Sequence, residues 1–127
     1  MATVLVVDDE FGIVDVVETI LTDEGYRVLT ACNGKQGLVR LAEQKPDVIL
    51  LDFMMPILDG AEMLRAMAAE PAHQRIPVIM MSSLREDVIA EKCKGCAAFL
   101  HKPFRAAAVL STIARVLGRG ANDTAQC

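Results

Sequence analysis

The chain has 127 residues, of which 53% are hydrophobic and 24% are charged, as expected for one globular domain and not for a disordered chain. A net charge of −4 and an aromatic content of 4% argue against nucleic-acid binding by this chain and against attraction to an anionic membrane. No apolar run reaches the roughly 18 residues that span a bilayer, and no signal peptide is recognised, so we expect a cytoplasmic protein.

Five short runs rich in β-branched and apolar residues predict strands. They are Thr3–Val7, Tyr26–Thr30, Val48–Leu51, Val78–Met81 and Ala97–Leu100. The first, third and fourth runs are apolar on both faces, which is typical of central strands that helices cover on both sides.

Five segments with helical spacing alternate with these strands. The first has one predicted apolar face and ends at Gly25. That face consists of Ile13, Val16, Val17, Ile20 and Leu21. The second segment begins at Asn33, a good N-cap residue, and ends before Pro46. The other three are predicted over about Leu58–Ala69, Arg85–Lys94 and Phe104–Leu117.

Five repeats of strand and then helix predict the α/β class, with a doubly wound, five-stranded parallel sheet and helices on both faces. Of the common strand orders we expect the flavodoxin-like order 2-1-3-4-5. One domain is expected over residues 1–117, and a polar C-terminal tail over residues 118–127.

Polar side chains stand where four of the predicted strands end. They are Asp8 and Asp9, Asp52, Ser82 and Ser83, and Lys102. Ligands of such sheets bind at the carboxyl ends of the strands, so we expect these side chains to converge. Close carboxylates repel one another unless a cation joins them, and oxygen ligands without His or Cys favour Mg²⁺. A metal, a lysine and a hydroxyl around Asp52 would cradle a phosphoryl group, with Asp52 as the nucleophile.

Four segments carry these residues in order and with matching spacing. They are Leu5–Glu10, Val48–Pro56 with Asp59-Gly60 behind it, Met80–Ser83 and Phe99–Phe104. Together they resemble the receiver domain of two-component response regulators, and the resemblance covers about Thr3 to Leu117.

The resemblance implies that Asp52 accepts a phosphoryl group from a histidine kinase or a phosphotransfer protein. It implies that Mg²⁺ is held by Asp8, Asp9, Asp52 and the backbone carbonyl of Met54, and that Lys102 contacts a phosphoryl oxygen. The product would be a signalling switch and not a turnover enzyme.

The same resemblance implies that Ser82 and Phe99 form the switch pair. They would change the surface around the fourth helix, the fifth strand and the fifth helix, where a downstream effector protein or domain would bind. The peptide bond before Pro103 is often cis in this family.

Other interpretations stay open at the level of single residues. Aspartates at strand ends often cap helices, Asp59-Gly60 fits a turn with a cap, Ser82 fits an ST-turn and Phe99 fits a core position. Alternative functions are a receiver fold that no longer uses phosphorylation, a flavodoxin, and an aspartyl-phosphate hydrolase. Met54 stands where that hydrolase would carry a second carboxylate.

Further residues carry finer expectations. In the family, the positions of Met54 and Leu84 flank the path of the hydrolytic water, and neither side chain can hydrogen-bond to water, so slow dephosphorylation is expected. Two positions stay open for Phe11: partly exposed beside the pocket, where it could anchor a histidine-bearing helix of the donor, or buried in the core. Val14 and the alanines at 106–108 are expected to add apolar surface, and the sequence leaves open whether that surface serves docking.

Cys93 and Cys96 form a C-x-x-C without further cysteine or histidine ligands in zinc-site spacing, and we interpret both as structural thiols. The sequence leaves open the cognate kinase, the output and whether a weak homodimer forms.

Overall fold

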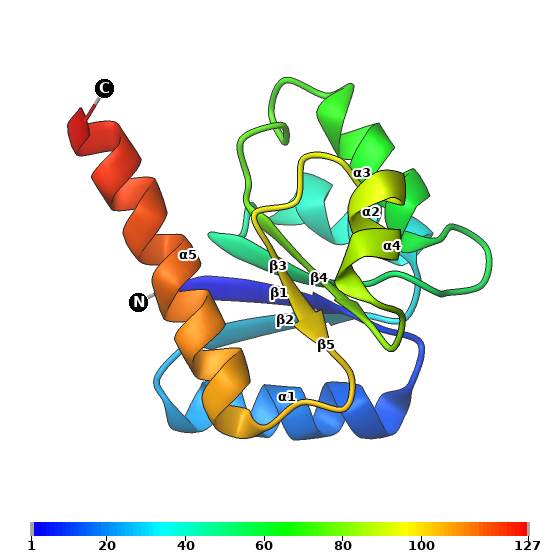
Figure 1. Ribbon diagram of the computed structural model, residues 1–127, viewed down its shortest axis with the longest axis horizontal. Helices are drawn as coiled ribbons and strands as arrows, with labels where there is room; N and C mark the ends of the chain where they lie inside the picture. Colours follow the sequence, from blue (N-terminus) through cyan, green and yellow to red (C-terminus); the bar gives the residue numbers. More distant parts are fainter. Residues whose placement is uncertain (1, 127) are drawn as a thin grey trace.

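Five parallel strands form the centre of the molecule (Figure 1). The computed structural model describes the backbone of residues 2–126 and the side chains of residues 2–118. The strands are β1 (Thr3–Val7), β2 (Arg27–Ala31), β3 (Val48–Asp52), β4 (Val78–Ser82) and β5 (Ala98–His101). Their order is β2-β1-β3-β4-β5 with every pair parallel, which confirms the predicted fold class and strand order.

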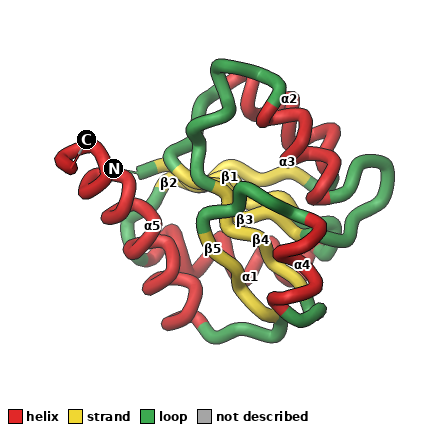
Figure 2. Tube along the Cα trace, turned by 45° about the horizontal axis from the view of Figure 1, so that its top comes forward, coloured by secondary structure: helices red, strands yellow, loops and turns green. Residues whose placement is uncertain are grey.

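Five helices alternate with the strands. They are α1 (Phe11–Asp23), α2 (Gly34–Glu43), α3 (Gly60–Ala68), α4 (Glu86–Lys92) and α5 (Ala106–Gln126). One face of the sheet is covered by α1 and α5 and the other by α2, α3 and α4 (Figures 1 and 2). Within the described part of the chain, no helix has both the length and the hydropathy needed to cross a bilayer.

Local sequence explains where several helices begin and end. The side chain of Asn33 accepts a hydrogen bond from the Gln36 amide at 2.8 Å, which caps α2 as predicted. Asp59 and Glu62 form a reciprocal capping box at the start of α3. Beyond the end of α1, Gly25 has a φ of 92°, the left-handed conformation that glycine adopts without strain.

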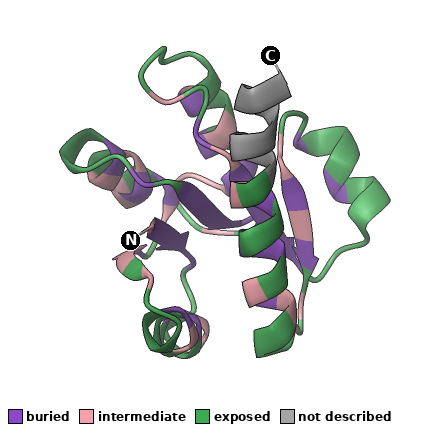
Figure 3. Ribbon diagram, turned by 90° about the vertical axis from the view of Figure 1, so that its left-hand side faces the viewer, coloured by how far each residue is buried: buried purple, intermediate pink, exposed green. Residues whose placement is uncertain are grey.

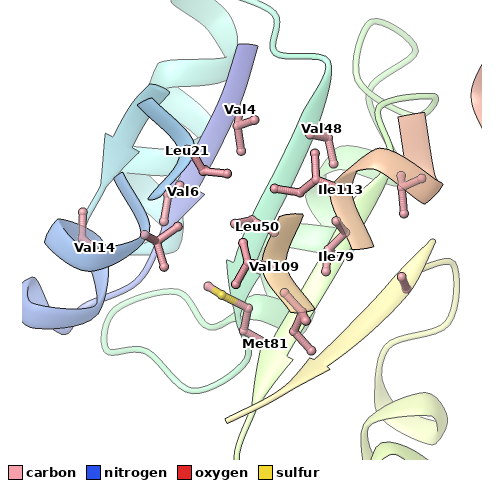
Figure 4. Packing of buried hydrophobic residues seen from close by; sticks show 14 residues of the cluster. Val4, Val6, Val14, Leu21, Val48, Leu50, Ile79, Met81, Val109 and Ile113 are labelled. Carbon is pink, nitrogen blue, oxygen red and sulfur yellow. The ribbon is translucent and has the colours of Figure 1, made fainter. Parts of the chain in front are cut away.

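Each face of the sheet has its own apolar core, because successive strand residues point to opposite faces. Toward α1 and α5, strand residues such as Val6 and Leu50 pack with Val109 and Ile113 (Figure 4). Toward α2, α3 and α4, Ile49 belongs to the second core. All five residues of β1, β3 and β4 are buried, as the two-sided apolar pattern predicted (Figure 3).

The buried face of α1 is rotated from the predicted one. Val14, Val17 and Leu21 are buried, whereas Val16 is 58% exposed. Apolar residues form more than one stripe along this helix, and the stripe that packs against the sheet is the one at i, i+3 and i+7 that starts at Val14. Val14 is therefore not available for docking, and the predicted burial of Val16 was wrong.

Helix α5 is longer than predicted. It continues through Gln126, and the predicted end at Leu117 was wrong. Gly118 does not adopt the left-handed conformation that would end the helix, and no proline follows it. The division of the chain into a domain over residues 1–117 and a tail over residues 118–127 remains a prediction. The first and last residues of the chain, Met1 and Cys127, lie outside the described residues.

Candidate functional site

The predicted site residues meet at the carboxyl edge of the sheet, which the arrowheads of the strands mark in Figure 1. Asp8 follows β1, Asp52 ends β3, Ser82 ends β4 and Lys102 follows β5. Asp8, Asp52 and Ser82 are buried, with exposed fractions of 1%, 4% and 7%. Charged groups are rare in protein interiors unless they are paired, so this edge is chemically unlike the rest of the core.

Lys102 joins the carboxylates of the site. Its Nζ lies 2.9 Å from Asp8 Oδ2, 3.2 Å from Asp52 Oδ1 and 3.6 Å from Glu10 Oε1. The lysine side chain is only 13% exposed, so its pairs with the buried Asp8 and Asp52 are poorly screened by water, whereas Glu10 is open to solvent. One ammonium group faces three carboxylates, and the pocket keeps an excess of negative charge.

That excess affects the protonation of Asp52. Burial, and then the charge of Asp8, raise the pKa of Asp52 to about 7, although Lys102 acts in the opposite direction. Burial lowers the pKa of Lys102, but its hydrogen bond to Asp8 and the charge of Asp52 outweigh this and raise that pKa above its ordinary value. Lys102 is therefore charged at neutral pH, and ionised Asp52 is electrostatically unfavourable without a further cation.

The oxygen atoms of the first loop fit a magnesium site. Asp8, Asp9 and Glu10 each offer a carboxylate oxygen, and these atoms lie within 4.8 Å of one another. The Glu10 amide donates to Asp8 Oδ1 at 3.0 Å, which fixes the buried carboxylate. An all-oxygen set without His or Cys is the kind that Mg²⁺ prefers. Glu10 was not among the predicted site residues, although the run of three acidic residues was a signal for it.

The loop behind Asp52 is held at close quarters. The Gly60 amide donates to the Phe53 carbonyl at 2.9 Å, and a Cβ on Gly60 would lie 2.5 Å from the Asp52 carbonyl oxygen. A Cβ on Gly34, the first residue of α2, would lie 2.5 Å from the Leu58 carbonyl oxygen. Neither position has room for a side chain, so β3, the start of α3 and the start of α2 are locked together.

Met54 stands in the same loop with its side chain 64% exposed. It lines a hollow of about 520 Å³ together with residues that include Asp9 and Asp59. Met54 therefore lies beside the acidic residues, as expected, and the role of its backbone carbonyl remains a prediction. Asp59 is a helix cap, as its turn-and-cap interpretation had it.

Ile57 is a feature that the sequence did not reveal. The Leu58 amide donates to the Pro56 carbonyl at 2.8 Å, which makes Ile57 the centre of a γ-turn with a φ of 73°. A β-branched residue rarely adopts this conformation, which costs about 1–2 kcal/mol. The Ile57 side chain is 74% exposed and gains little from packing. Without a glycine or asparagine at position 57, no signal marked this turn.

The predicted switch residues lie next to a small cavity. The Ser82 hydroxyl accepts a hydrogen bond from the Leu84 amide at 3.0 Å, the ST-turn that the sequence left open as an alternative. Phe99 is half-buried, and both residues line a cavity of about 20 Å³ between β4, α4 and β5. The Lys102–Pro103 peptide bond is cis, as the resemblance implied.

Apolar surface adjoins the site on the α1 side. Phe11 is the first residue of α1 and is 78% exposed, which agrees with the exposed position and not with the core position that the sequence also left open. A groove of about 330 Å³ between α1 and the β5–α5 corner is lined by Val16, Phe104 and Lys102 among others. The alanines at 106 and 107 are exposed at the start of α5.

The two cysteines of the C-x-x-C are unpaired, Cys93 buried and Cys96 half-buried. Burial, and then the neighbouring Cys93, raise the pKa of Cys96 to about 12, and burial also raises the pKa of Cys93. Among the described residues, neither belongs to a cluster of three metal-ligating side chains. Thiols with raised pKa values are poor nucleophiles, which supports a structural role.

Comparison with known proteins gives the same family for most of the chain. The family model described as "Response regulator receiver domain" matches residues 4–114. The transcriptional regulatory protein AfsQ1 of Streptomyces coelicolor is 32% identical over 126 residues, which are 98% of this chain and 55% of AfsQ1. The chain spans about half the length, or less, of the first curated relatives that it matches.

Solved structures agree with this family. The chemotaxis response regulator CheY4 of Vibrio cholerae superposes with a TM-score of 0.87 at 33% identity, over 91% of this chain and 98% of CheY4. The receiver domain of the sensor histidine kinase PA1611 from Pseudomonas aeruginosa, with a magnesium ion coordinated in its active-site cleft, gives 0.84 at 30% identity. That match covers 92% of this chain and 98% of the other. Sequence, fold and the acidic edge of the sheet thus agree, and the chain belongs to the family of response regulator receiver domains.

Proposed function

We propose that Asp52 is the phosphoacceptor of this receiver domain and that it takes its phosphoryl group from a histidine kinase or a phosphotransfer protein with the aid of Mg²⁺. The observation that carries the proposal is the buried Asp52 carboxylate, 3.2 Å from the Lys102 ammonium and beside the acidic run that begins at Asp8.

The transfer follows from the charges of the pocket. An oxygen of Asp52 attacks phosphorus in line, the bond between phosphorus and the donor nitrogen breaks, and the phosphoryl group stays on Asp52 as an acyl phosphate. Lys102 provides one positive charge to the phosphoryl oxygens, which is too little for a pocket with Asp8 and Asp9 nearby.

Asp8, Asp9, Asp52 and the carbonyl of Met54 would hold Mg²⁺, which would supply the missing positive charge. The magnesium in the cleft of the similar PA1611 receiver domain supports this part of the proposal. Without a cation, the raised pKa of Asp52 leaves a smaller share of its nucleophilic, ionised form at neutral pH than an ordinary aspartate would have.

Phosphorylation would act on the surface through Ser82 and Phe99. The Ser82 hydroxyl would leave the Leu84 amide and donate to a phosphoryl oxygen. The cavity of about 20 Å³ that both residues line would then grow, and the half-buried ring of Phe99 would move into it. The surface of α4, β5 and α5 would change, and a downstream effector protein or domain would recognise the change.

A protein donor fits the surroundings of the pocket better than a small molecule alone. Phe11 is exposed beside it, and the groove between α1 and the β5–α5 corner opens next to Lys102. Apolar side chains of this kind anchor partner proteins.

Intact mass after incubation with acetyl phosphate and Mg²⁺ tests the phosphoacceptor. We expect the wild-type chain to gain one phosphoryl group only when Mg²⁺ is present, and the Asp52→Ala variant to gain none. Asp15→Ala is the matched control, because Asp15 is an exposed acidic residue of α1 outside the cluster, and it should behave as wild type. A wild-type chain that stays unmodified would favour the alternative of a receiver fold that does not use phosphorylation.

The switch is tested by NMR with beryllofluoride, a mimic of the phosphoryl group. In the wild type we expect amide shifts in α4, β5 and α5. In Phe99→Ala we expect phosphorylation by acetyl phosphate to persist while those shifts are lost. Equal shifts in both proteins would rule out a role for the ring.

A further inference from the structure

Glu10 stands between two parts of the site. Its Oε1 lies 3.6 Å from Lys102 Nζ, and its carboxylate belongs to the cluster with Asp8 and Asp9. The Glu10 side chain is 63% exposed, while its backbone amide is fixed on Asp8 Oδ1 at 3.0 Å. The exposed carboxylate of Glu10 is thus held next to the buried carboxylate of Asp8 by the backbone of Glu10.

Lys102 is paired with carboxylates that would also hold the cation. Its ammonium contacts Asp8 at 2.9 Å and Asp52 at 3.2 Å, the two buried carboxylates that are expected to bind metal. For Asp8 to bind a divalent ion, its interaction with Lys102 has to weaken. A buried ammonium without a partner is costly, so Lys102 needs another carboxylate when it releases Asp8.

We infer that Glu10 is a positioning residue of the magnesium site: it accepts Lys102 when Asp8 turns to the cation, and it adds a fourth negative charge near that cation, beyond those of Asp8, Asp9 and Asp52. The inference rests on the proposed function, because it assumes that Asp8 and Asp9 hold Mg²⁺. Glu10 acts through Lys102 and through its field, and it is not placed among the direct ligands.

Both effects of Glu10 favour the bound cation. Without its charge, the attraction on Mg²⁺ falls; without its carboxylate, Lys102 stays on Asp8. Glu10→Gln should therefore weaken Mg²⁺ binding about three- to tenfold at low ionic strength, and by less at high salt. Glu10→Asp keeps the charge and should recover part of the affinity.

The experiment is an NMR titration of the ¹⁵N-labelled chain with MgCl₂ and no phosphodonor, so that it measures binding alone. Wild type, Glu10→Gln, Glu10→Asp and Glu24→Gln are compared at low and high salt. Glu24 is an exposed carboxylate at the opposite end of α1 and serves as the matched control, whose dissociation constant should equal that of wild type. The rate of acetyl phosphate labelling at saturating Mg²⁺ is measured in parallel.

The outcomes separate this inference from the proposed function. Mg²⁺ binding that is weakened by Glu10→Gln, partly restored in Glu10→Asp and unchanged in Glu24→Gln supports the inference. Equal dissociation constants for wild type and Glu10→Gln overturn it and leave Asp52 as the phosphoacceptor. A labelling rate that stays low at saturating Mg²⁺ also overturns it, because Glu10 would then act on the transfer itself. Absence of Mg²⁺ binding by wild type overturns the proposed function as well.

Discussion

The middle of the sheet and its carboxyl edge are built from the same strands but obey different rules. In the middle, residues such as Leu50 and Ile79 are fully buried and apolar, and every neighbour adds to the core. At the carboxyl ends of these strands, the charged side chains of Asp8, Asp52 and Lys102 lie in the same protein interior. The domain therefore gains stability in the middle of the sheet and loses part of it at the carboxyl edge, where the chemistry requires charge.

The largest effect is expected in the middle of the sheet. Leu50→Ala removes a fully buried side chain from the core between the sheet and α1 and α5, and should lower the free energy of unfolding by about 3–4 kcal/mol. Urea denaturation measures it. The loss should be the same at pH 5 and pH 8, since no charge is involved. A loss that changed strongly with pH would mean that the stability of the apolar middle of the sheet also depends on the charged edge.

At the edge, removing charge should stabilise the protein. The folded-state pKa of Asp52 is about 7, above its unfolded value near 3.8, so folding binds a proton between these values and Asp52 destabilises the fold as pH rises toward 7. Asp52→Asn should therefore gain stability over wild type, and the gain should be about 3 kcal/mol larger at pH 8 than at pH 5 without Mg²⁺. Urea denaturation at both pH values, repeated with Mg²⁺, checks this. A gain that did not depend on pH would contradict the raised pKa.

A smaller gain is expected in the loop that carries Asp52. Ile57→Asn places a residue that tolerates positive φ at the centre of the γ-turn, and should raise the free energy of unfolding by about 1 kcal/mol. Thermal unfolding measures the shift, and Ile57→Val is the control, because valine is also β-branched and keeps the strain. Loss of stability in the asparagine variant would mean that the exposed isoleucine makes a contribution that outweighs its backbone cost.

The smallest effect is expected for the lifetime of the phosphoryl group on Asp52. Met54 and Leu84 are 64% and 37% exposed, and neither offers a hydrogen bond to an attacking water. Met54→Asn or Leu84→Asn should speed the loss of the phosphoryl group about three- to tenfold, the worth of one hydrogen bond to that water. Decay of the phosphorylated mass over time checks it, with Met54→Leu as the apolar control. No acceleration in either asparagine variant would count against slow dephosphorylation by default.

The strands, the capped helices and the residues at the strand ends could be predicted from the sequence. Strand runs with two apolar faces and helices with clear caps, such as the one at Asn33, were placed within one or two residues. The strand ends then brought Asp8, Asp52, Ser82 and Lys102 to one edge, because parallel topology leaves them no other arrangement.

Features decided by tertiary contacts were not predictable. The apolar residues of α1 fit two overlapping stripes, and only packing against the sheet buried Val14 and exposed Val16. Gly118 can end a helix or continue one, and here it continues α5. The γ-turn at Ile57 opposes local preference, and the contact of Glu10 with Lys102 depends on how two loops meet in space.

The tight seats of Gly34 and Gly60 have a mechanical consequence. Through Gly60 the start of α3 lies against the end of β3, and through Gly34 the start of α2 lies against Leu58 in the loop between them, so these elements have no room to shift against one another. Helix α4 packs on the same face of the sheet, but it has seven residues and buries one of them, Ile89, so we expect it to be displaced more easily. We therefore expect a rearrangement that begins at Asp52 to reach the surface through α4, because the starts of α2 and α3 have no room to move.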